Sequence, residues 1–189
     1  MNIKDPMLIN EVFTQEEFLR LKNTMYSLPK TKESYDQGFN RYHVFDPILL
    51  EYTKKALPIA RKYFNSETLV PSYTLFSHYQ GENPNLFKHK DDNACTYTVD
   101  MCVYQTNPWD LWVDDKPYTL FENQALAYYG NEQMHWREKF PHGKEDFVAM
   151  VFFHFVEPDH WWVTKGPRYI DVIRKNITEE EFLNEHSNN

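Results

Sequence analysis

The segment "NLFKHKDDNACTY" holds a histidine and a carboxylate at a spacing that suits a metal site. His89 and Asp91 are two residues apart, so on an extended chain their side chains leave the same face and can bind one ion. The pair is weak evidence alone, because charged surface turns have the same composition. A third ligand has to come from elsewhere in the chain, and His135 in "EQMHWREKF" is the strongest candidate.

Two imidazoles and one carboxylate on one face of an ion are the ligand set of non-haem Fe(II) oxygenases. Such a set leaves other positions open for a cosubstrate and O₂, whereas a structural zinc site is closed by four protein ligands. The three residue types therefore predict a catalytic metal site.

The composition disfavours several other classes of protein. The net charge is −8 and the Lys and Arg residues are scattered, which argues against a nucleic-acid partner. No apolar run approaches the roughly 20 residues of a membrane helix, and "MNIKDPMLINEVF" lacks the pattern of a signal peptide. We expect a cytoplasmic protein with no membrane or nucleic-acid partner, in which Cys95 and Cys102 are reduced thiols.

Helices are expected in two N-terminal segments and one C-terminal segment. In "VFTQEEFLRLKNTMYSL", Thr14 is the predicted N-cap and Glu17 its capping-box partner. A second helix, "DPILLEYTKKALPIARKYF", is expected to start at Asp46 with Pro47 and to break or kink near Pro58. A short third helix is expected in "NITEEEFLNE".

From residue 72 onward the pattern is typical of strands. Six short segments are rich in β-branched and aromatic residues and are separated by turn residues. They are "SYTLFSHY", "CTYTVDMCVY", "LWVDD", "YTLF", "QALAYYG" and "DFVAMVFFHFV". The expected fold is mainly β with flanking helices (α+β), and the strand pattern alone allows a sandwich, a barrel or a jelly roll. We expect one domain over residues 1–189, with a helical N-terminal part (1–70), a β core (72–163) and a C-terminal extension (164–189) with a short helix.

The order of the motifs resembles that of the 2-oxoglutarate/Fe(II)-dependent dioxygenases, in particular their prolyl-4-hydroxylase-like bacterial and phage group. The resemblance runs from residue 72 to about residue 154. It covers "SYTLFSHYQG", "HKDDNAC", "PWDLWVDDKPYTL", "ALAYYGNEQ", "HWREKF" and "VFFHF", in that order. It implies a double-stranded β-helix (jelly roll) core with the N-terminal helices packed outside.

The resemblance also implies cofactors and site residues. It implies three Fe(II) ligands, which are His89, Asp91 and His135. The cosubstrates are 2-oxoglutarate and O₂, and the far carboxylate of 2-oxoglutarate needs a buried cation. Lys144, nine residues after His135, is the first candidate and Arg137 the rival. Arginine binds a carboxylate through two hydrogen bonds and lysine as a point charge. Tyr79 is expected to add a phenol hydrogen bond.

The sequence departs from the group at two positions. Asp92 stands where the group tends to have a basic residue, which we interpret as a change in substrate selection. Asn123 stands where glycine is usual, and asparagine tolerates the positive φ that such a turn needs.

Several other residues are expected to be structural. His154, at the end of an apolar strand, is expected to be a hydrogen-bonded residue and not a fourth ligand. The tryptophans are expected mainly to pack. Trp161 and Trp162 are read as a cover over one end of the barrel, with a partner-binding edge as the alternative, and His78, His142 and His160 are given no role.

The predicted function is hydroxylation of a C–H bond coupled to decarboxylation of 2-oxoglutarate. The leading substrate is a prolyl or other protein side chain, with a small molecule as the alternative. Two other functions stay open: a non-catalytic jelly-roll module that binds a ligand, and Zn²⁺-assisted hydrolysis on a cupin-like barrel.

Overall fold

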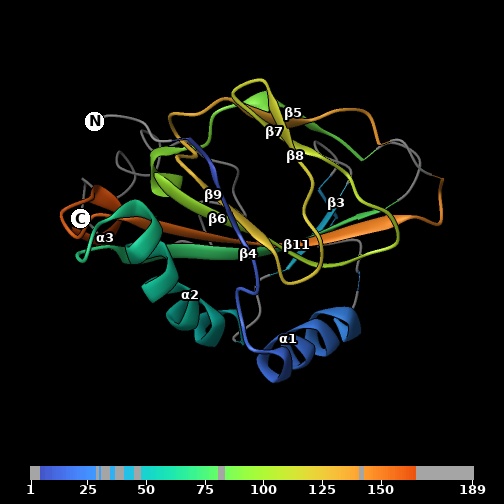
Figure 1. The fold of residues 1–189 in the computed structure, drawn as a ribbon, viewed down its shortest axis with the longest axis horizontal. Coiled ribbons are helices and arrows are strands. Elements are labelled where there is room, and N and C mark those ends of the chain that lie inside the picture. Colours follow the sequence, from blue (N-terminus) through green and yellow to red (C-terminus); the bar gives the residue numbers. More distant parts are fainter. Residues whose placement is uncertain are drawn as a thin grey trace, which may run out of the picture. The chain divides into compact units, whose positions relative to one another are not determined.

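The structure is a computed structural model that describes residues 5–28, 30, 35–36, 41–44, 48–80, 84–140 and 143–164. It divides into two compact units, Met1–Glu157 and Pro158–Asn189. In the second unit the described chain forms one short helix, α3 (Trp161–Thr164). The described chain is mostly β-sheet with few helices, as the sequence predicts (Figure 1). The helix predicted in "NITEEEFLNE" lies outside the described residues.

Helix α1 (Gln15–Ser27) begins where the capping signal predicts. Thr14 is the N-cap: its side chain accepts a hydrogen bond from the backbone N–H of Glu17, and the Glu17 carboxylate accepts one from the backbone N–H of Thr14. Such a cap contributes about 1 kcal/mol to stability. The buried residues Phe18, Leu21 and Met25 recur at helical spacing and fix the face that packs inward.

Helix α2 (Ile48–Phe64) runs through Pro58 without the predicted interruption. Proline in a helix removes one hydrogen bond and costs about 3 kcal/mol, but Pro58 lies on the exposed face. Packing of the buried face of α2 offsets that cost. This face consists of Leu49, Tyr52, Thr53, Ala56, Ala60 and Phe64. The predicted start at Asp46 and Pro47 lies outside the described residues.

All strand pairs in the described chain are antiparallel, and they form two sheets. The larger sheet has the spatial order β1 (Met7–Ile9), β9 (Ala125–Tyr128), β6 (Tyr97–Gln105), β11 (Phe147–Val156), β4 (Val70–Gln80), β3 (Arg41–Val44) and β2 (Tyr35–Asp36). The smaller sheet has the order β5 (Leu86–His89), β10 (His135–Arg137), β7 (Leu111–Val113) and β8 (Lys116–Tyr118). The 3-10 turn η2 (Asn93–Cys95) precedes β6.

Alternation along the central strand β11 separates two hydrophobic cores. Val148, Met150 and Phe152 pack with Leu86 of β5 and Leu111 of β7, in the core between the two sheets. The intervening residues of β11 pack in the other core with α1 and α2, and these residues are Ala149, Val151, Phe153 and Phe155. In Figure 1 the two helices therefore lie on one side of the larger sheet, and β5, β7 and β8 lie on the other.

Several strands differ from the predicted ones. The strand predicted over 111–115 ends at Val113, because Asp114 and Asp115 both have positive φ (47° and 64°) and form the two-residue turn of the β7–β8 hairpin. The strand predicted over 118–121 overlaps β8 (Lys116–Tyr118) only at Tyr118. The short strands β1, β2, β3, β5 and β10 were not predicted, and three of them lie in the N-terminal third that was expected to be helical.

Other local expectations are met. Asn123 has a positive φ (62°), and its side chain hydrogen-bonds both the N–H and the C=O of Phe13, which ties the turn before β9 to the segment before α1. Cys95 and Cys102 are buried and not bridged.

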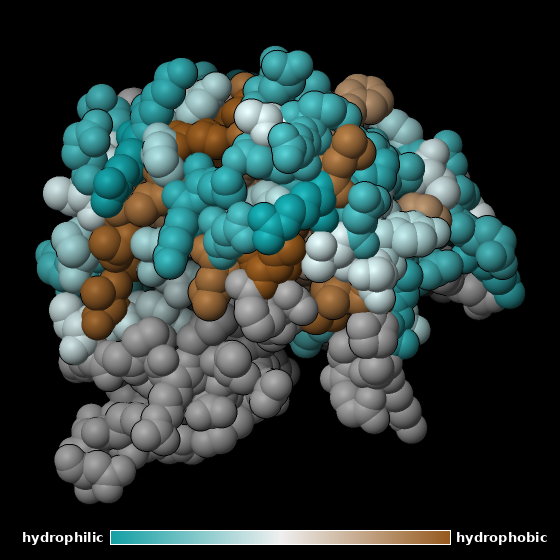
Figure 2. Space-filling model, turned by 90° about the horizontal axis from the view of Figure 1, so that it is seen from below, coloured by the Kyte–Doolittle hydropathy of each residue, from teal (hydrophilic) through white to brown (hydrophobic). Residues whose placement is uncertain are grey.

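The surface on the side of the helices is largely hydrophilic, and hydrophobic residues appear on it as separate patches (Figure 2). Isolated exposed apolar residues of this kind are ordinary on a globular protein. Within the described ranges, none of the helices has both the length and the apolar character needed to cross a membrane.

Candidate metal centre

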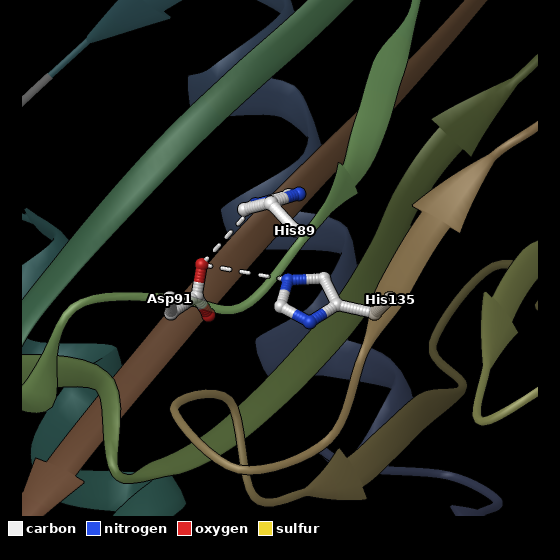
Figure 3. A group of neighbouring side chains, drawn as sticks. All are labelled: His89, Asp91 and His135. Atoms are coloured by element: carbon white, nitrogen blue, oxygen red, sulfur yellow. Dashed lines mark ion pairs between the residues drawn. The ribbon is translucent and has the colours of Figure 1, made fainter.

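Neighbouring strands of the smaller sheet bring the three predicted ligands together. His89 ends β5, His135 begins β10, and the two residues are direct register partners across the antiparallel pair. Asp91 follows β5 by two residues, in the short link to η2. The two imidazole rings lie 4.3 Å apart between centroids, with the Asp91 carboxylate beside both (Figure 3).

The donor atoms converge on one point. Nε2 of His89 and Nε2 of His135 each lie 3.4 Å from Oδ1 of Asp91. Two ligands at right angles on a divalent ion with bonds of about 2.1 Å are about 3.0 Å apart, so a small contraction would suffice. The His135 side chain is 3% exposed, whereas those of His89 and Asp91 are 30% and 19% exposed. These atoms could hold one metal ion at a site that stays accessible from one side.

Each imidazole has its other nitrogen occupied by a backbone carbonyl. Nδ1 of His89 lies 2.6 Å from the carbonyl oxygen of Phe87, and Nδ1 of His135 lies 3.0 Å from that of Gln133. A carbonyl only accepts, so in both rings Nδ1 carries the proton and donates it. Nε2 is then left with a free lone pair, which is the tautomer that a metal ion requires.

The backbone of Gly130 lies close to Asp91 and fixes its position. Its N–H donates to the carbonyl oxygen of Gly130 at 2.9 Å. A Cβ on Gly130 would lie 2.6 Å from Oδ2 of Asp91 and 2.5 Å from the carbonyl oxygen of Cys95, so only glycine fits there. Asp92, for which the sequence suggests a part in substrate selection, is the N-cap of η2 and accepts from the N–H of Ala94 at 2.9 Å.

Gln133 supplies the backbone carbonyl that binds Nδ1 of His135, and its role was not predicted from the sequence. Its side-chain oxygen accepts from the N–H of Tyr129, and its amide donates to Asp114 in the hairpin turn, at 2.9 and 2.8 Å. The side chain is thus anchored at both ends and only 2% exposed. This anchoring fixes the backbone carbonyl that orients His135.

The electrostatics of the three residues favour a positive charge beside Asp91. Burial opposes ionisation of Asp91, but His135 and His89, when protonated at Nε2, outweigh it through hydrogen bonds and hold the pKa of this carboxyl well below its usual range. Burial likewise opposes protonation of His135, yet the hydrogen bond and the charge of Asp91 raise its pKa above the ordinary value. The cluster is therefore an anionic pocket that attracts a cation.

A cavity opens beside the three residues, and sequence reasoning had not singled out several of the side chains that line it. Its lining includes Arg41 from β3, Tyr73, Asp100 from β6, Tyr128 from β9 and Phe152 from β11. Of these, Asp100 had a readable signal, because a carboxylate in the middle of the apolar run "CTYTVDMCVY" is unusual for a buried strand.

The three residues predicted to bind a cosubstrate lie in different surroundings. None of the three is part of the cavity lining, and Lys144 is exposed. Arg137 is 5% exposed. Its guanidinium carbon lies 5.0 Å from the centroid of the Trp109 ring, and its guanidinium donates a hydrogen bond to the backbone carbonyl of Trp109. Tyr79 is fully buried, packs edge-on against Trp109, and accepts a hydrogen bond from Arg41 at 3.0 Å.

Arg137 has an unusual environment for a buried cation. Among the residues that the structure describes, no carboxylate forms an ion pair with it, and the Trp109 carbonyl is its hydrogen-bond acceptor. A buried, unpaired guanidinium is costly, since charges inside proteins are normally paired.

His154 lines the same cavity from β11 and is a hydrogen-bonded residue, as predicted. Its Nδ1 lies 3.1 Å from the hydroxyl of Thr98, and burial lowers its pKa to about 4, so the ring is neutral. With Asp91 and Cys95 it forms a second group of potential ligand atoms, which shares Asp91 with the first. Trp109 is buried and packs against Phe140, in line with the expected packing role.

No protein-family model matches the chain. No curated protein matches its sequence either.

Solved structures of 2-oxoglutarate-dependent oxygenases share the fold. HygX from Streptomyces hygroscopicus, with nickel, 2-oxoglutarate and hygromycin B bound, matches with a TM-score of 0.64 at 11% identity, over 84% of this chain and 85% of that one. EctD from S. alaskensis, with 2-oxoglutarate and 5-hydroxyectoine, matches with a TM-score of 0.63 at 9% identity, over 84% and 78%. The viral collagen prolyl hydroxylase vCPH from Paramecium Bursaria Chlorella virus-1, in its 2-oxoglutarate complex, gives 0.57 at 12% identity, over 80% and 96%.

At such low identities the similarity is one of fold. It covers most of this chain and includes a prolyl hydroxylase, the group that the motif order resembles.

Proposed function

We propose that the protein is an Fe(II)- and 2-oxoglutarate-dependent dioxygenase that hydroxylates a C–H bond. The overall reaction converts 2-oxoglutarate, O₂ and R–H into succinate, CO₂ and R–OH. The observation that carries the proposal is the convergence of two imidazole Nε2 atoms and one carboxylate oxygen beside a cavity, in a fold shared with such enzymes.

The proposal includes the architecture around the site. We infer that the two facing sheets are the halves of a double-stranded β-helix, with α1 and α2 packed outside it and β1 to β3 extending the larger sheet. The order of the strands and the core between the sheets support this reading. A cytoplasmic location fits the two unbridged cysteines.

In this proposal His89, Asp91 and His135 hold the iron by one face. The donor set suits the metal, because imidazole and carboxylate ligands that leave positions open are characteristic of Fe(II) oxygenases. Bound there, iron would supply the activation of O₂ that no side chain can provide. The protein's own part is to keep both Nε2 lone pairs free and to limit access of water to the cavity.

Arg137 is the proposed partner for the far carboxylate of 2-oxoglutarate. It is buried and has no carboxylate partner among the described residues, and guanidinium can bind a carboxylate through two parallel hydrogen bonds. Burial lowers the pKa of Arg137, and the nearby Tyr79 opposes this change. Lys144 is the less favoured candidate, because its side chain is exposed.

The substrate class has to be found by a screen that includes both peptides and small molecules. Among the solved neighbours, vCPH is a collagen prolyl hydroxylase and the HygX structure contains hygromycin B. A prolyl or other protein side chain is the first candidate, because the motif order resembles the prolyl-4-hydroxylase-like group.

Succinate formation tests the proposal. Purified protein with Fe(II), O₂ and 2-oxoglutarate should produce succinate, and a pool that contains the substrate should increase the rate. Asp91→Asn should abolish the activity. Asp92→Asn should not, because the Asp92 side chain caps η2 and an asparagine can cap it equally well. Activity with Zn²⁺ that needs no 2-oxoglutarate would support metal-assisted hydrolysis instead, and binding of a ligand unaffected by His135→Ala would support a non-catalytic module.

A further inference from the structure

A second group of potential metal ligands adjoins the candidate metal centre. It consists of Asp91, Cys95 and His154, and one ligand atom from each of these residues lies within 4.8 Å of those of the other two. We call these residues the second ligand set. Asp91 belongs to both groups, but Cys95 comes from η2 and His154 from β11 of the larger sheet. The second set therefore has a thiol where the candidate metal centre has an imidazole.

The turn η2 brings Cys95 back toward Asp91. The side chain of Asp92 caps η2, and its backbone carbonyl accepts from the N–H of Cys95 at 2.9 Å. A Cβ on Gly130 would lie 2.6 Å from Oδ2 of Asp91 and 2.5 Å from the carbonyl oxygen of Cys95. Asp91 and Cys95 thus pack against the same point of the backbone, which holds the two residues in place relative to each other.

Thr98 determines the tautomer of His154. The Thr98 hydroxyl donates to the carbonyl oxygen of Cys95 at 3.0 Å, so it has no proton left for Nδ1 of His154, 3.1 Å away. Nδ1 therefore carries the ring proton and donates it to the Thr98 oxygen. The lone pair is then on Nε2, which has no hydrogen-bond partner among the described residues. His154 is 5% exposed, so this imidazole is a buried ligand with its lone pair unused.

Tyr73 supports the sulfur atom of the second ligand set. Its hydroxyl lies 2.8 Å from Sγ of Cys95, and its ring lies 4.4 Å from the His154 ring between centroids. A thiolate can only accept a hydrogen bond, so the phenol is the donor once the thiol has lost its proton. Hydrogen bonds to metal ligands orient them and strengthen metal binding. Tyr73, Asp91 and His154 also line the cavity beside the candidate metal centre, which gives an ion a route to the set.

The three ligand types select a soft or borderline divalent ion. Thiolate and imidazole together suit Zn²⁺, whereas Mg²⁺ and Ca²⁺ prefer oxygen ligands. Tetrahedral ligands of Zn²⁺ are about 3.4–3.6 Å apart, so the three atoms would have to approach one another by at most about 1.4 Å. The thiolate and the carboxylate offset the two charges of such an ion, which allows it to bind among buried side chains.

We propose that Asp91, Cys95 and His154 form a second cation site, which binds a soft divalent ion of the Zn²⁺ class. The ligand atoms are a carboxylate oxygen of Asp91, Sγ of Cys95 and Nε2 of His154. Binding forms a metal–sulfur bond and breaks the S–H bond, and the proton goes to solvent. This inference does not rest on the proposed function, because it requires neither iron nor 2-oxoglutarate.

A Cd²⁺ titration of the metal-free, reduced protein tests the site. Cd²⁺ is the probe because a cadmium–thiolate bond gives an ultraviolet charge-transfer band that nitrogen and oxygen ligands do not give. In the wild-type protein the band should saturate at one Cd²⁺ per chain, and Cys95→Ser should remove it. Cys102→Ser is the matched control and should keep the full band. Cys102 is as buried as Cys95 but belongs to neither group of potential ligands in the described chain.

Three further variants separate the second ligand set from the candidate metal centre. Tyr73→Phe keeps all the ligands and loses the hydrogen bond to sulfur, so it should shift the band and weaken Cd²⁺ binding about 10–100-fold. His154→Ala loses a ligand and should weaken binding by more than Tyr73→Phe does. His135→Ala should leave the band and its saturation point unchanged, because His135 belongs only to the candidate metal centre.

X-ray absorption of the Cd²⁺-loaded wild-type protein tests the site without any variant, and it should detect one sulfur neighbour beside nitrogen and oxygen. A spectrum with nitrogen and oxygen neighbours alone would overturn the inference. So would a band that persists in Cys95→Ser, or one that is lost from a His135→Ala variant with wild-type circular dichroism. None of these results bears on succinate formation, so the proposed function and this inference can fail separately.

Discussion

Replacing Gly130 with alanine is expected to displace the carboxylate of the candidate metal centre. The new Cβ would lie 2.6 Å from Oδ2 of Asp91 and from the Thr98 hydroxyl, and 2.5 Å from the carbonyl oxygen of Cys95. Ordinary contacts to a Cβ begin at 3.4 Å, so these atoms would have to move by about 0.8 Å. One of them is backbone that leads into β6, and so the strain cannot be relieved by a side-chain rotation alone.

The size of the effect follows from that displacement. Overpacking of this kind costs roughly 1–3 kcal/mol of unfolding free energy, which lowers Tm by roughly 3–10 °C for a chain of this length. Disturbing the support of a metal ligand typically weakens metal binding about 10–100-fold. Differential scanning calorimetry of the metal-free protein and a Co²⁺ titration followed by absorption measure the two effects separately.

Gly143→Ala is the matched control. Gly143 is exposed, and the nearest atom to its added Cβ is Oδ2 of Asp146 at 3.7 Å, an ordinary contact. This variant should bind Co²⁺ as the wild type does and unfold at nearly the same temperature. Wild-type Co²⁺ affinity in Gly130→Ala would refute the reasoning, because it would mean that Asp91 is not held where the structure has it or does not bind the metal.

Three further changes have defined outcomes. Gln133→Leu removes both side-chain anchors behind His135, so Co²⁺ affinity should fall about 10–100-fold, and an unchanged titration would contradict this. Thr14→Ala removes the cap of α1 and should lower the unfolding free energy in urea by about 1 kcal/mol while Co²⁺ affinity stays the same. Burial lowers the pKa of His78 to about 4, against an ordinary value of 6.5 in the unfolded chain, so its contribution to stability is complete above pH 6.5 and is lost as the pH falls to 4. His78→Asn should flatten the pH dependence of the unfolding free energy in this range by about 3 kcal/mol, and an equally steep profile in the variant would show that His78 is not the group responsible.

Local chemistry made the most predictable parts of the fold visible in the sequence. Thr14 and Glu17 specify the start of α1 through a bond pattern that spans four residues, and the structure contains both halves of it. The strands rich in β-branched and aromatic residues were also found, because β4, β6 and β11 are 9 to 11 residues long.

The missed elements depend on contacts between distant segments. β10 has only three residues, and it is a strand because β5 and β7 pair with it from both sides. The two-residue turn at Asp114 and Asp115 was not predicted, because the segment 111–115 has the pattern of a strand and only the positive φ of the two residues shows the turn.

The candidate site divides in the same way. The spacing of His89 and Asp91 indicated a shared face but was weak evidence alone, and pairing them with His135 required the register of β5 on β10 or a resemblance between motif orders. His135 and Arg137 are two residues apart on a strand, a signal that both are on one face, and both prove to be buried. For Lys144, which follows a turn glycine, the sequence offers no comparable signal of burial or exposure.

The central claim, that His89, Asp91 and His135 hold an iron to which 2-oxoglutarate binds, is tested most directly by an anaerobic absorption titration. We expect a weak visible charge-transfer band that appears only when both Fe(II) and 2-oxoglutarate are present, saturates at one 2-oxoglutarate per protein, and is absent from Asp91→Ala. A wild-type protein that develops no band, or an Asp91→Ala variant that develops the same band, would contradict it.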